Sequence, residues 1–182
     1  SLILYGLRDL IGADAIDSAL YNFNQEFGKR QAPPFPGSSD LYRHLAAKTP
    51  DSLMYYLDDT WNKITLYDNK AEEVTAKKIA EGEYDVTLKL KSQKLYADSG
   101  GQESNAEYDG DYIDVGIFAA DDTDENGKDR VNPLFVQKYK IKPGETTLTI
   151  RVKGEPSKAG IDPYNKLIDR IPDDNTISVD VE

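Results

Sequence analysis

Apolar residues recur at helical spacing through the first third of the chain. Leucines at positions 2, 4, 7 and 10 precede Gly12, and this spacing predicts a first helix that ends at the glycine. A second amphipathic helix follows, with apolar residues at i, i+3, i+4, i+7 and i+11, namely Ile16, Ala19, Leu20, Phe23 and Phe27. We expect it to end at Gly28. The segment 31–37 contains three prolines and is therefore predicted to be a loop.

Two shorter helices are predicted after this loop. Ser38 or Ser39 suits an N-cap, and Leu41 and Leu45 would lie on the buried side of a third helix. Thr49 followed by a proline then opens a fourth helix, because proline is favoured at the first helical position. The apolar positions of this fourth helix are Leu53, Leu57 and Trp61.

Beyond Lys63 the hydrophobic period changes from helical spacing to two, which indicates strands. Three runs alternate clearly, at 84–91, 113–117 and 147–153. Weaker strands are predicted at 64–67, 74–79, 134–141 and 176–181. Turn residues stand between the runs at Glu81-Gly82, Asn126-Gly127 and Pro143-Gly144.

Helices followed by a separate run of antiparallel strands predict an α+β chain. We expect a helical segment of about four helices over residues 1–62 and an antiparallel β-sandwich of about seven strands over residues 63–182. The junction is predicted between Trp61 and Asn69. In the tail, Asp162-Pro163 is expected to start one helical turn that reaches Ile168 and is stopped by Pro172.

Composition narrows the function classes. The chain has 182 residues, no cysteine and one histidine, which excludes disulfide scaffolds, thiolate metal sites and an HExxH pair within it. His44 is the lone histidine, and we expect it to be a packing or surface residue because no partner completes a site. No apolar run is long enough for a transmembrane helix, and the first residues do not have the pattern of a signal peptide.

The charge is acidic and unevenly distributed. There are 22 basic and 33 acidic residues, for a formal charge of -11. Six bases and eight acids fall in residues 1–66, whereas residues 67–182 hold 16 bases and 25 acids. Such a surface repels phosphate groups, so neither nucleic acid nor an anionic lipid surface is expected as a partner.

One short motif suggests a metal site. Asp122, Asp124 and Asn126, with Gly127 after them, match the first six positions of a calcium loop, whose oxygen ligands suit a hard cation. Position twelve of that loop should be glutamate but is Pro133. The alternative is an Asn-Gly turn in an acidic hairpin, and it is the stronger interpretation. No serine-hydrolase elbow, phosphate-binding loop or dinucleotide fingerprint occurs.

The first third of the chain carries a family resemblance. Leu2-Ile-Leu-Tyr-Gly-Leu-Arg-Asp-Leu-Ile-Gly12, then Ala19-Leu20 with Phe23, then Phe35-Pro36-Gly-Ser-Ser-Asp40-Leu41, resembles the segment that follows the active site in M1-family (gluzincin) zinc aminopeptidases. The stretch Leu53–Trp61 is similar to the helix that precedes the family's β module. The tail 159–175 resembles that of bacterial membrane-associated members.

This resemblance implies a non-catalytic C-terminal portion of such a peptidase. The family's zinc ligands, its general-base glutamate and its transition-state tyrosine would all lie upstream of Ser1, so no residue here is assigned a catalytic, cofactor or zinc role. The implied partners are an upstream catalytic domain in the same polypeptide and, for that parent, zinc and a peptide substrate. The implied location is the extracytoplasmic face of a bacterial membrane. The fragment is expected to be inactive by itself.

The rival interpretation is an independent binding module built on the acidic sandwich, dependent on calcium or a glycan. The tyrosines and phenylalanines of the chain could line a carbohydrate or peptide groove, although most occupy core-compatible positions. The two interpretations differ at the start of the chain. The peptidase interpretation predicts an unpaired apolar face around Leu2, Leu4 and Leu7, and the module interpretation predicts a self-contained fold.

Overall fold

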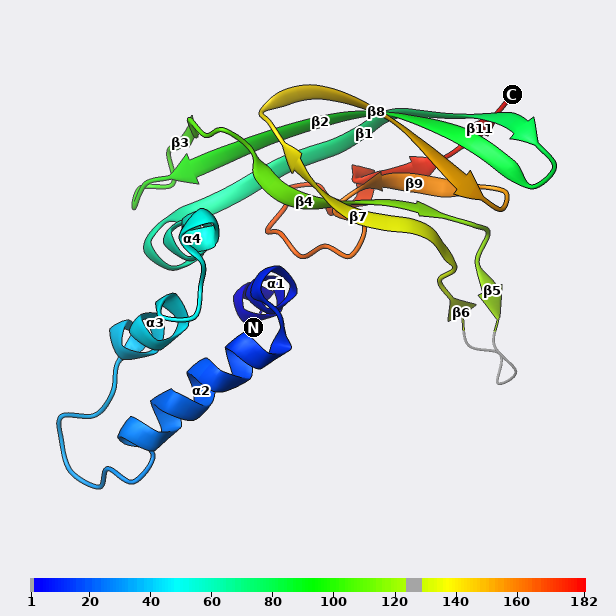
Figure 1. Ribbon diagram of the computed structural model, residues 1–182. Coiled ribbons are helices and arrows are strands. Elements are labelled where there is room, and N and C mark those ends of the chain that lie inside the picture. The colour runs from blue at the N-terminus through cyan, green and yellow to red at the C-terminus, as the bar shows by residue number, and fades with distance from the viewer. Residues whose placement is uncertain (1, 124–128) are drawn as a thin grey trace. The chain divides into compact units, whose positions relative to one another are not determined.

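The computed structural model describes residues 2–123 and 129–182. The chain divides into two compact units (Figure 1). The first, here called the helical unit, comprises residues 1–65 and 97–101. The second, the sandwich unit, comprises residues 66–96 and 102–182. No helix within the described ranges combines the length and apolar character needed to cross a membrane.

Three of the predicted helices are confirmed. They are α1 (Leu2–Ile11), α2 (Ala13–Phe27) and α3 (Ser38–Ala46). Gly12 separates α1 from α2 with a φ of 90°, a left-handed conformation that glycine adopts without steric cost. The start of α3 differs from the prediction, because the N-cap is Gly37. Its N–H donates to the Asp40 carboxylate at 2.9 Å, so an acidic side chain in the first turn replaces a serine cap.

The fourth predicted helix consists of three short pieces. A 3-10 turn η1 (Asp51–Leu53) leads into α4 (Met54–Leu57), and a π turn η2 (Asp58–Asn62) follows. The Thr60 hydroxyl donates to the Tyr56 carbonyl at 2.6 Å. A threonine bonded to the carbonyl four residues earlier competes with the helical backbone ladder, which fits the widened turn here.

The helical unit has a small core. Leu7, Ala19, Leu45 and Leu57 have no exposed surface. The expected apolar stripe of α2 is confirmed except at Leu20, which remains 37% exposed. α2 makes contacts with α1 and α3. The apolar side of α2 therefore packs within the helical unit, except at Leu20.

The sandwich unit contains a five-stranded sheet. Its strands are β1 (Ile64–Ala80), β2 (Glu83–Ala97), β3 (Glu103–Asn105), β8 (Gly144–Lys153) and β11 (Asp180–Val181). The order is β11-β1-β2-β3, and β8 pairs with β2 in antiparallel register. The β11–β1 pair is parallel, so the sheet is not wholly antiparallel. The two weak strands predicted at 64–67 and 74–79 form the single long strand β1.

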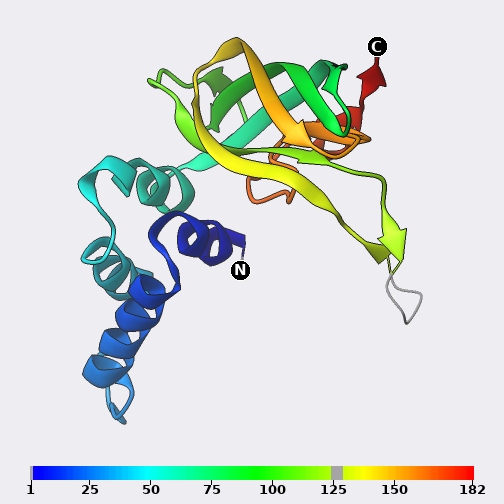
Figure 2. The ribbon, with the colours of Figure 1, turned by 45° about the vertical axis from the view of Figure 1, so that its right-hand side comes forward.

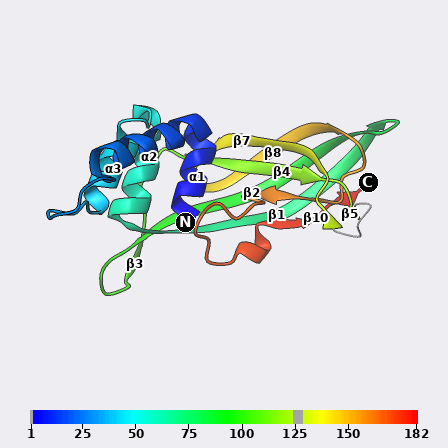
Figure 3. The same ribbon diagram turned by 90° about the horizontal axis from the view of Figure 1, so that it is seen from below.

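A four-stranded antiparallel sheet faces it. Its strands are β4 (Asp111–Phe118), β7 (Pro133–Ile141), β9 (Lys158–Ile161) and β10 (Thr176–Ser178), in the order β10-β9-β4-β7. Figure 3 shows β4 and β7 running side by side along the unit. A short ribbon pairs β5 (Asp122–Thr123) with β6 (Asp129–Arg130). The two sheets hold nine strands, more than the seven expected. β3 and β9 are too short to give an alternating pattern, and the predicted strand 176–181 is divided into β10 and β11.

The two sheets face each other (Figure 2), and one hydrophobic core of buried side chains lies between them. The clearest predicted runs supply it, with Val86, Leu88 and Leu90 from β2 and Ile113, Val115 and Ile117 from β4, all at most 2% exposed. Cross-strand register explains this, because alternate residues of each strand point to one face. The sandwich architecture predicted from period-two spacing is therefore confirmed.

The predicted helical turn at 162–168 is wrong. This segment is a loop, and a 3-10 turn η3 (Pro172–Asp174) begins at the proline expected to stop the helix. The physical reason is the Asp162 carboxylate, which accepts the backbone N–H groups of Lys166 and Leu167, each at 2.9 Å. Asp162 itself has a φ of 42°, outside the helical region.

Candidate functional site

Two members of the calcium motif, Asp124 and Asn126, lie outside the described residues. Asp122 belongs to β5 and pairs through its backbone register with Arg130. In the described part of the chain, no group of three or more histidine, cysteine, aspartate or glutamate side chains is arranged to hold a metal ion. Calcium binding at this motif therefore stays a prediction.

His44 forms a packed and hydrogen-bonded cluster in the helical unit. Its Nε2 lies 2.9 Å from a Glu26 carboxylate oxygen, and its ring meets Phe23 and Phe27 edge-on at centroid distances of 5.8 and 6.4 Å. Arg43 donates to both oxygens of the same Glu26 at 2.8 and 3.0 Å. These hydrogen bonds hold the pKa of Glu26 below its usual value, with Arg43 as the main cause. The cluster joins α2 to α3, as a packing histidine does.

Large apolar side chains of the helical unit are exposed. On α1, Leu2 is 40% and Tyr5 is 52% exposed, and the i, i+3 spacing places them on one face. On α2, Leu20 and Tyr21 are 37% and 63% exposed, and Phe35 in the following loop is 63% exposed. We call Leu2, Tyr5, Leu20, Tyr21 and Phe35 the apolar surface of the helical unit. The unpaired face expected around Leu2, Leu4 and Leu7 is wrong at Leu7, which is fully buried because it packs in the core of the unit, and only Leu2 of the three is exposed.

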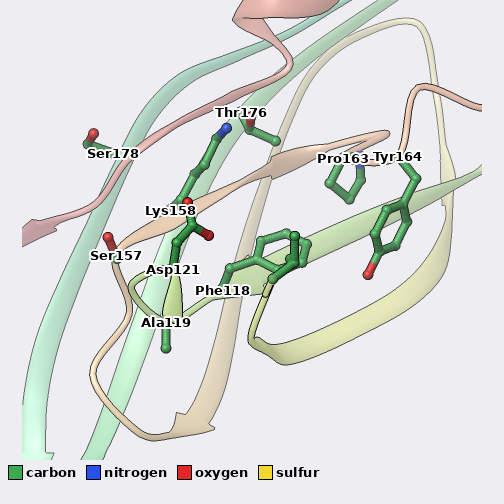
Figure 4. A pocket seen from close by; sticks show the side chains of 10 residues that line it. Phe118, Ala119, Asp121, Ser157, Lys158, Pro163, Tyr164, Thr176 and Ser178 are labelled. Carbon is green, nitrogen blue, oxygen red and sulfur yellow. The ribbon is translucent and has the colours of Figure 1, made fainter. Parts of the chain in front are cut away.

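In the sandwich unit, a pocket lies on the outer face of the four-stranded sheet (Figure 4). Its volume is about 290 Å³. Strand register sets its floor, because Phe118 lies opposite Lys158, which lies opposite Ser178 across β4, β9 and β10. Pro163 and Tyr164 form a wall, and the Tyr164 ring meets the Phe118 ring edge-on at 6.1 Å.

Two glycines make this wall fit. Gly116 and Gly160 lie opposite each other on β4 and β9. A Cβ at Gly116 would approach the Phe118 ring to 2.7 Å and Pro163 to 2.9 Å, and one at Gly160 would lie 1.9 Å from the Asn175 carbonyl oxygen. Only glycine at position 116 therefore leaves room for the Phe118 ring and Pro163 against the sheet. Only glycine at position 160 leaves room for the close approach of the backbone at Asn175.

A charged cluster holds the adjacent loop. The buried Asp114 carboxylate of β4 accepts from Lys138 at 2.7 Å and from Lys166 at 2.6 Å. Its neighbour Asp162 is 1% exposed, and burial raises the pKa of its carboxyl to about 6 despite the two backbone N–H groups that it accepts. This loop fixes Pro163 and Tyr164 at the pocket wall.

A second buried charge pair lies between the sheets. Lys94 of β2 is 1% exposed and its Nζ lies 2.9 Å from Oδ2 of Asp111, which is 3% exposed. The Tyr67 hydroxyl donates to the same carboxylate at 2.7 Å. Burying two charges is costly unless they are paired and hydrogen-bonded, and here they are. The Lys94–Asp111 pair is therefore part of the interior of the sandwich unit and not of its surface.

Sequence reasoning missed both features of the sandwich unit. The pocket depends on register between residues about twenty and forty positions apart, which no local pattern reveals. The Lys94 pair did leave a signal, because the alternation of Tyr84, Val86, Leu88 and Leu90 continues inward through positions 92 and 94. A lysine on the core face of a strand requires a buried partner.

Comparisons with known proteins do not identify a family for this chain. No family model matches the sequence, and no curated protein and no solved structure does so either.

Proposed function

We propose that this chain is the non-catalytic C-terminal region of an M1-like zinc aminopeptidase and that its helical unit supports the catalytic domain of the same polypeptide. In this proposal the parent is associated with a bacterial membrane, with this region on the extracytoplasmic side. The parent removes residues from the N-terminus of peptides, and the 182-residue chain is inactive alone.

The observation that carries the proposal is the apolar surface of the helical unit. Covering one exposed leucine or aromatic side chain contributes roughly 1.5–3 kcal/mol at most when it is fully buried. The five residues of this surface are all exposed by more than a third.

Zinc in this proposal is held by the upstream domain. The described residues of this chain do not fit a zinc site, because no three-ligand group is present among them and His44 is engaged with Glu26. The role left to the helices is positional. Displacing a catalytic group by about 1 Å lowers the rate by about a hundredfold, so elements packed behind a site affect activity without touching substrate.

The test uses the longer polypeptide that includes the sequence upstream of Ser1. We expect Tyr5→Ser combined with Leu20→Ser to lower kcat/KM for an aminoacyl p-nitroanilide by about tenfold or more while bound zinc is retained. The matched control is Tyr112→Ser in the sandwich unit, since Tyr112 is 43% exposed and its loss should leave kcat/KM unchanged. Equal activity of the double variant and the control would contradict the supporting role.

The pocket of the sandwich unit favours a second candidate, an acidic binding module. It combines an aromatic wall with hydroxyl groups of Thr176 and Ser178, the Lys158 ammonium and the Asp121 carboxylate. Such convergence of apolar and polar groups is typical of small-molecule and sugar sites. Titration with monosaccharides, followed by the NMR shifts of Ser178 and Tyr164, tests it. Saturable shifts, together with an unchanged kcat/KM of the Tyr5→Ser, Leu20→Ser double variant, would favour this candidate.

A further inference from the structure

The inference concerns the buried pair formed by Lys94 and Asp111. Lys94 belongs to β2 in the five-stranded sheet, and Asp111 is the first residue of β4 in the four-stranded sheet. The Lys94 Nζ and Asp111 Oδ2 atoms are 2.9 Å apart, and Oδ2 is bonded directly to the carboxyl carbon that the nitrogen would attack. A covalent bond here would join the two sheets across the core.

The surroundings hold the two groups in direct contact away from solvent. The Nζ atom lies 4.2 Å from the centroid of the Tyr108 ring, and Tyr67 donates its hydroxyl to the Asp111 carboxylate at 2.7 Å. Both members of the pair are at least 97% buried. A proton passed from the ammonium to the carboxylate oxygen that it contacts would leave a neutral amine beside a neutral acid, the forms that condense.

The backbone holds both groups in place. The Lys94 carbonyl accepts from the Ala106 N–H at 2.9 Å, and Asp111 pairs in register with Ile141. Gly110 before it has a φ of 101°, and a Cβ there would lie 2.8 Å from the Ile141 carbonyl oxygen. Asp111 is therefore anchored by close backbone approach, and its carboxylate is held in contact with the Lys94 Nζ atom.

We propose that Lys94 and Asp111 condense to form an intramolecular isopeptide bond. The proton moves from Nζ to the carboxylate, and the Nζ lone pair then attacks the Asp111 carbonyl carbon. The carbon–oxygen single bond breaks, and the hydroxyl leaves with the second nitrogen proton as one molecule of water. Tyr67 donates its hydroxyl to Oδ2, the oxygen that faces Nζ, takes up its proton and leaves as water, so this hydrogen bond assists the departing oxygen. No oxidant, reductant or further reactant is required.

Two physical effects favour the bond over the ion pair. Condensation removes two charges from the interior, where their burial is costly. The fixed geometry also gives the two groups an effective concentration that reaches about 10⁵–10⁸ M in well-oriented intramolecular reactions, far above that of bulk water. The released water can leave the core, which opposes hydrolysis.

Intact-mass spectrometry of the purified full chain under denaturing conditions tests the proposal. We expect the wild-type mass to be lower than its sequence mass by one molecule of water. The Lys94→Arg variant should have the full mass of its own sequence, since the arginine keeps the positive charge but does not condense. Circular dichroism of Lys94→Arg verifies that it folds. A wild-type chain at its full sequence mass would overturn the proposal.

Peptide mapping separates this bond from water loss at Asp109-Gly110, which a succinimide would also cause. No lysine or arginine lies between Lys94 and Lys128, so trypsin releases residues 92–128 as one uncut peptide, short of one water, if Lys94 is linked. Cleavage after Lys94 in a dehydrated chain would assign the loss to another position and overturn the proposal.

Discussion

The two units of this chain differ in how completely they bury their own apolar residues. Among the described residues, the helical unit has seven buried apolar residues and six exposed large ones. The sandwich unit has 18 buried and eight exposed. Large exposed apolar residues are about as frequent in both units, so the units differ mainly in the size of their hydrophobic cores. The helical unit therefore has the smaller hydrophobic core of the two.

The buried charged residues show a contrast in the same direction, since the helical unit buries only Asp59 among its described charged residues. The sandwich unit buries Lys94, Asp111, Asp114 and Asp162, each with hydrogen-bonded or ionic partners. In the helical unit the cluster of Glu26, Arg43 and His44 is largely exposed at Glu26 and Arg43. Substitutions that remove buried charges should therefore affect the sandwich unit far more strongly than any surface change affects the helical unit.

The largest effect is expected from Lys94→Ala. The substitution leaves the Asp111 carboxylate buried without Lys94, as an ion or as the partner in the proposed bond, and breaking a buried pair in this way costs about 3–5 kcal/mol. Urea unfolding followed by tryptophan fluorescence and circular dichroism measures the loss. The control is Lys91→Ala on the same strand, which is exposed and should change the free energy of unfolding by less than about 0.5 kcal/mol. Equal effects would show that the buried pair contributes nothing specific.

A comparable loss is expected from Ile117→Ala in the sandwich core. Ile117 has no exposed surface, and removal of a buried isoleucine side chain to alanine costs about 2–5 kcal/mol through lost burial and the cavity left behind. Hydrogen exchange of the β2 and β4 amides measures it directly. Protection that does not change in either strand would contradict the single core shared by the two sheets.

A smaller, pH-dependent effect is expected at Asp162. Burial raises its pKa from 3.8 to about 6, so the folded state favours the protonated form. The stabilisation is fully present below about pH 4 and is lost as the pH rises through 6, which amounts to about 2–3 kcal/mol at 1.36 kcal/mol per pKa unit.

The measurement is the free energy of unfolding between pH 4 and 7 for wild type and Asp162→Asn. We expect the fall attributable to this group to disappear in the variant, although asparagine keeps one acceptor for the two backbone N–H groups of the loop. Asp180→Asn at an exposed position is the control and should keep the wild-type slope. An unchanged slope in Asp162→Asn would mean that another group titrates in this range.

The smallest effect on stability is expected at the apolar surface of the helical unit. Tyr5→Ser with Leu20→Ser should change the free energy of unfolding of the isolated chain by about 0.5 kcal/mol or less per residue, because both side chains are already exposed. Thermal unfolding of the isolated chain tests this. A loss of several kcal/mol would show that these side chains already pack within the chain and are not free to contact a partner.

The sequence predicts the elements whose pattern is long and regular. The stripe of Ile16, Ala19 and Phe27 and the alternation in β2 and β4 were sufficient for the helices and the sandwich. Short strands such as β9 gave no pattern, since four residues cannot establish a period. The helical turn expected after Asp162 failed because its side chain binds the backbone N–H groups that a helix would have used.

The candidate sites were less predictable than the fold. The Phe118, Lys158 and Ser178 row of the pocket is created by pairing of three strands that are distant in sequence. The alternation of β2 places Lys94 on the core face of the strand, but it does not show which residue pairs with it. Residue type and spacing alone do not identify Asp111 as the buried partner, because β2 and β4 belong to different sheets.

Zinc content and aminopeptidase activity, measured in parallel on this chain and on the polypeptide that extends upstream of Ser1, test the central claim most directly. We predict one zinc ion per molecule and hydrolysis of an aminoacyl p-nitroanilide in the longer polypeptide, and neither in the 182-residue chain with added zinc. Stoichiometric zinc with activity in the 182-residue chain, or the absence of both from the longer polypeptide, would contradict the assignment.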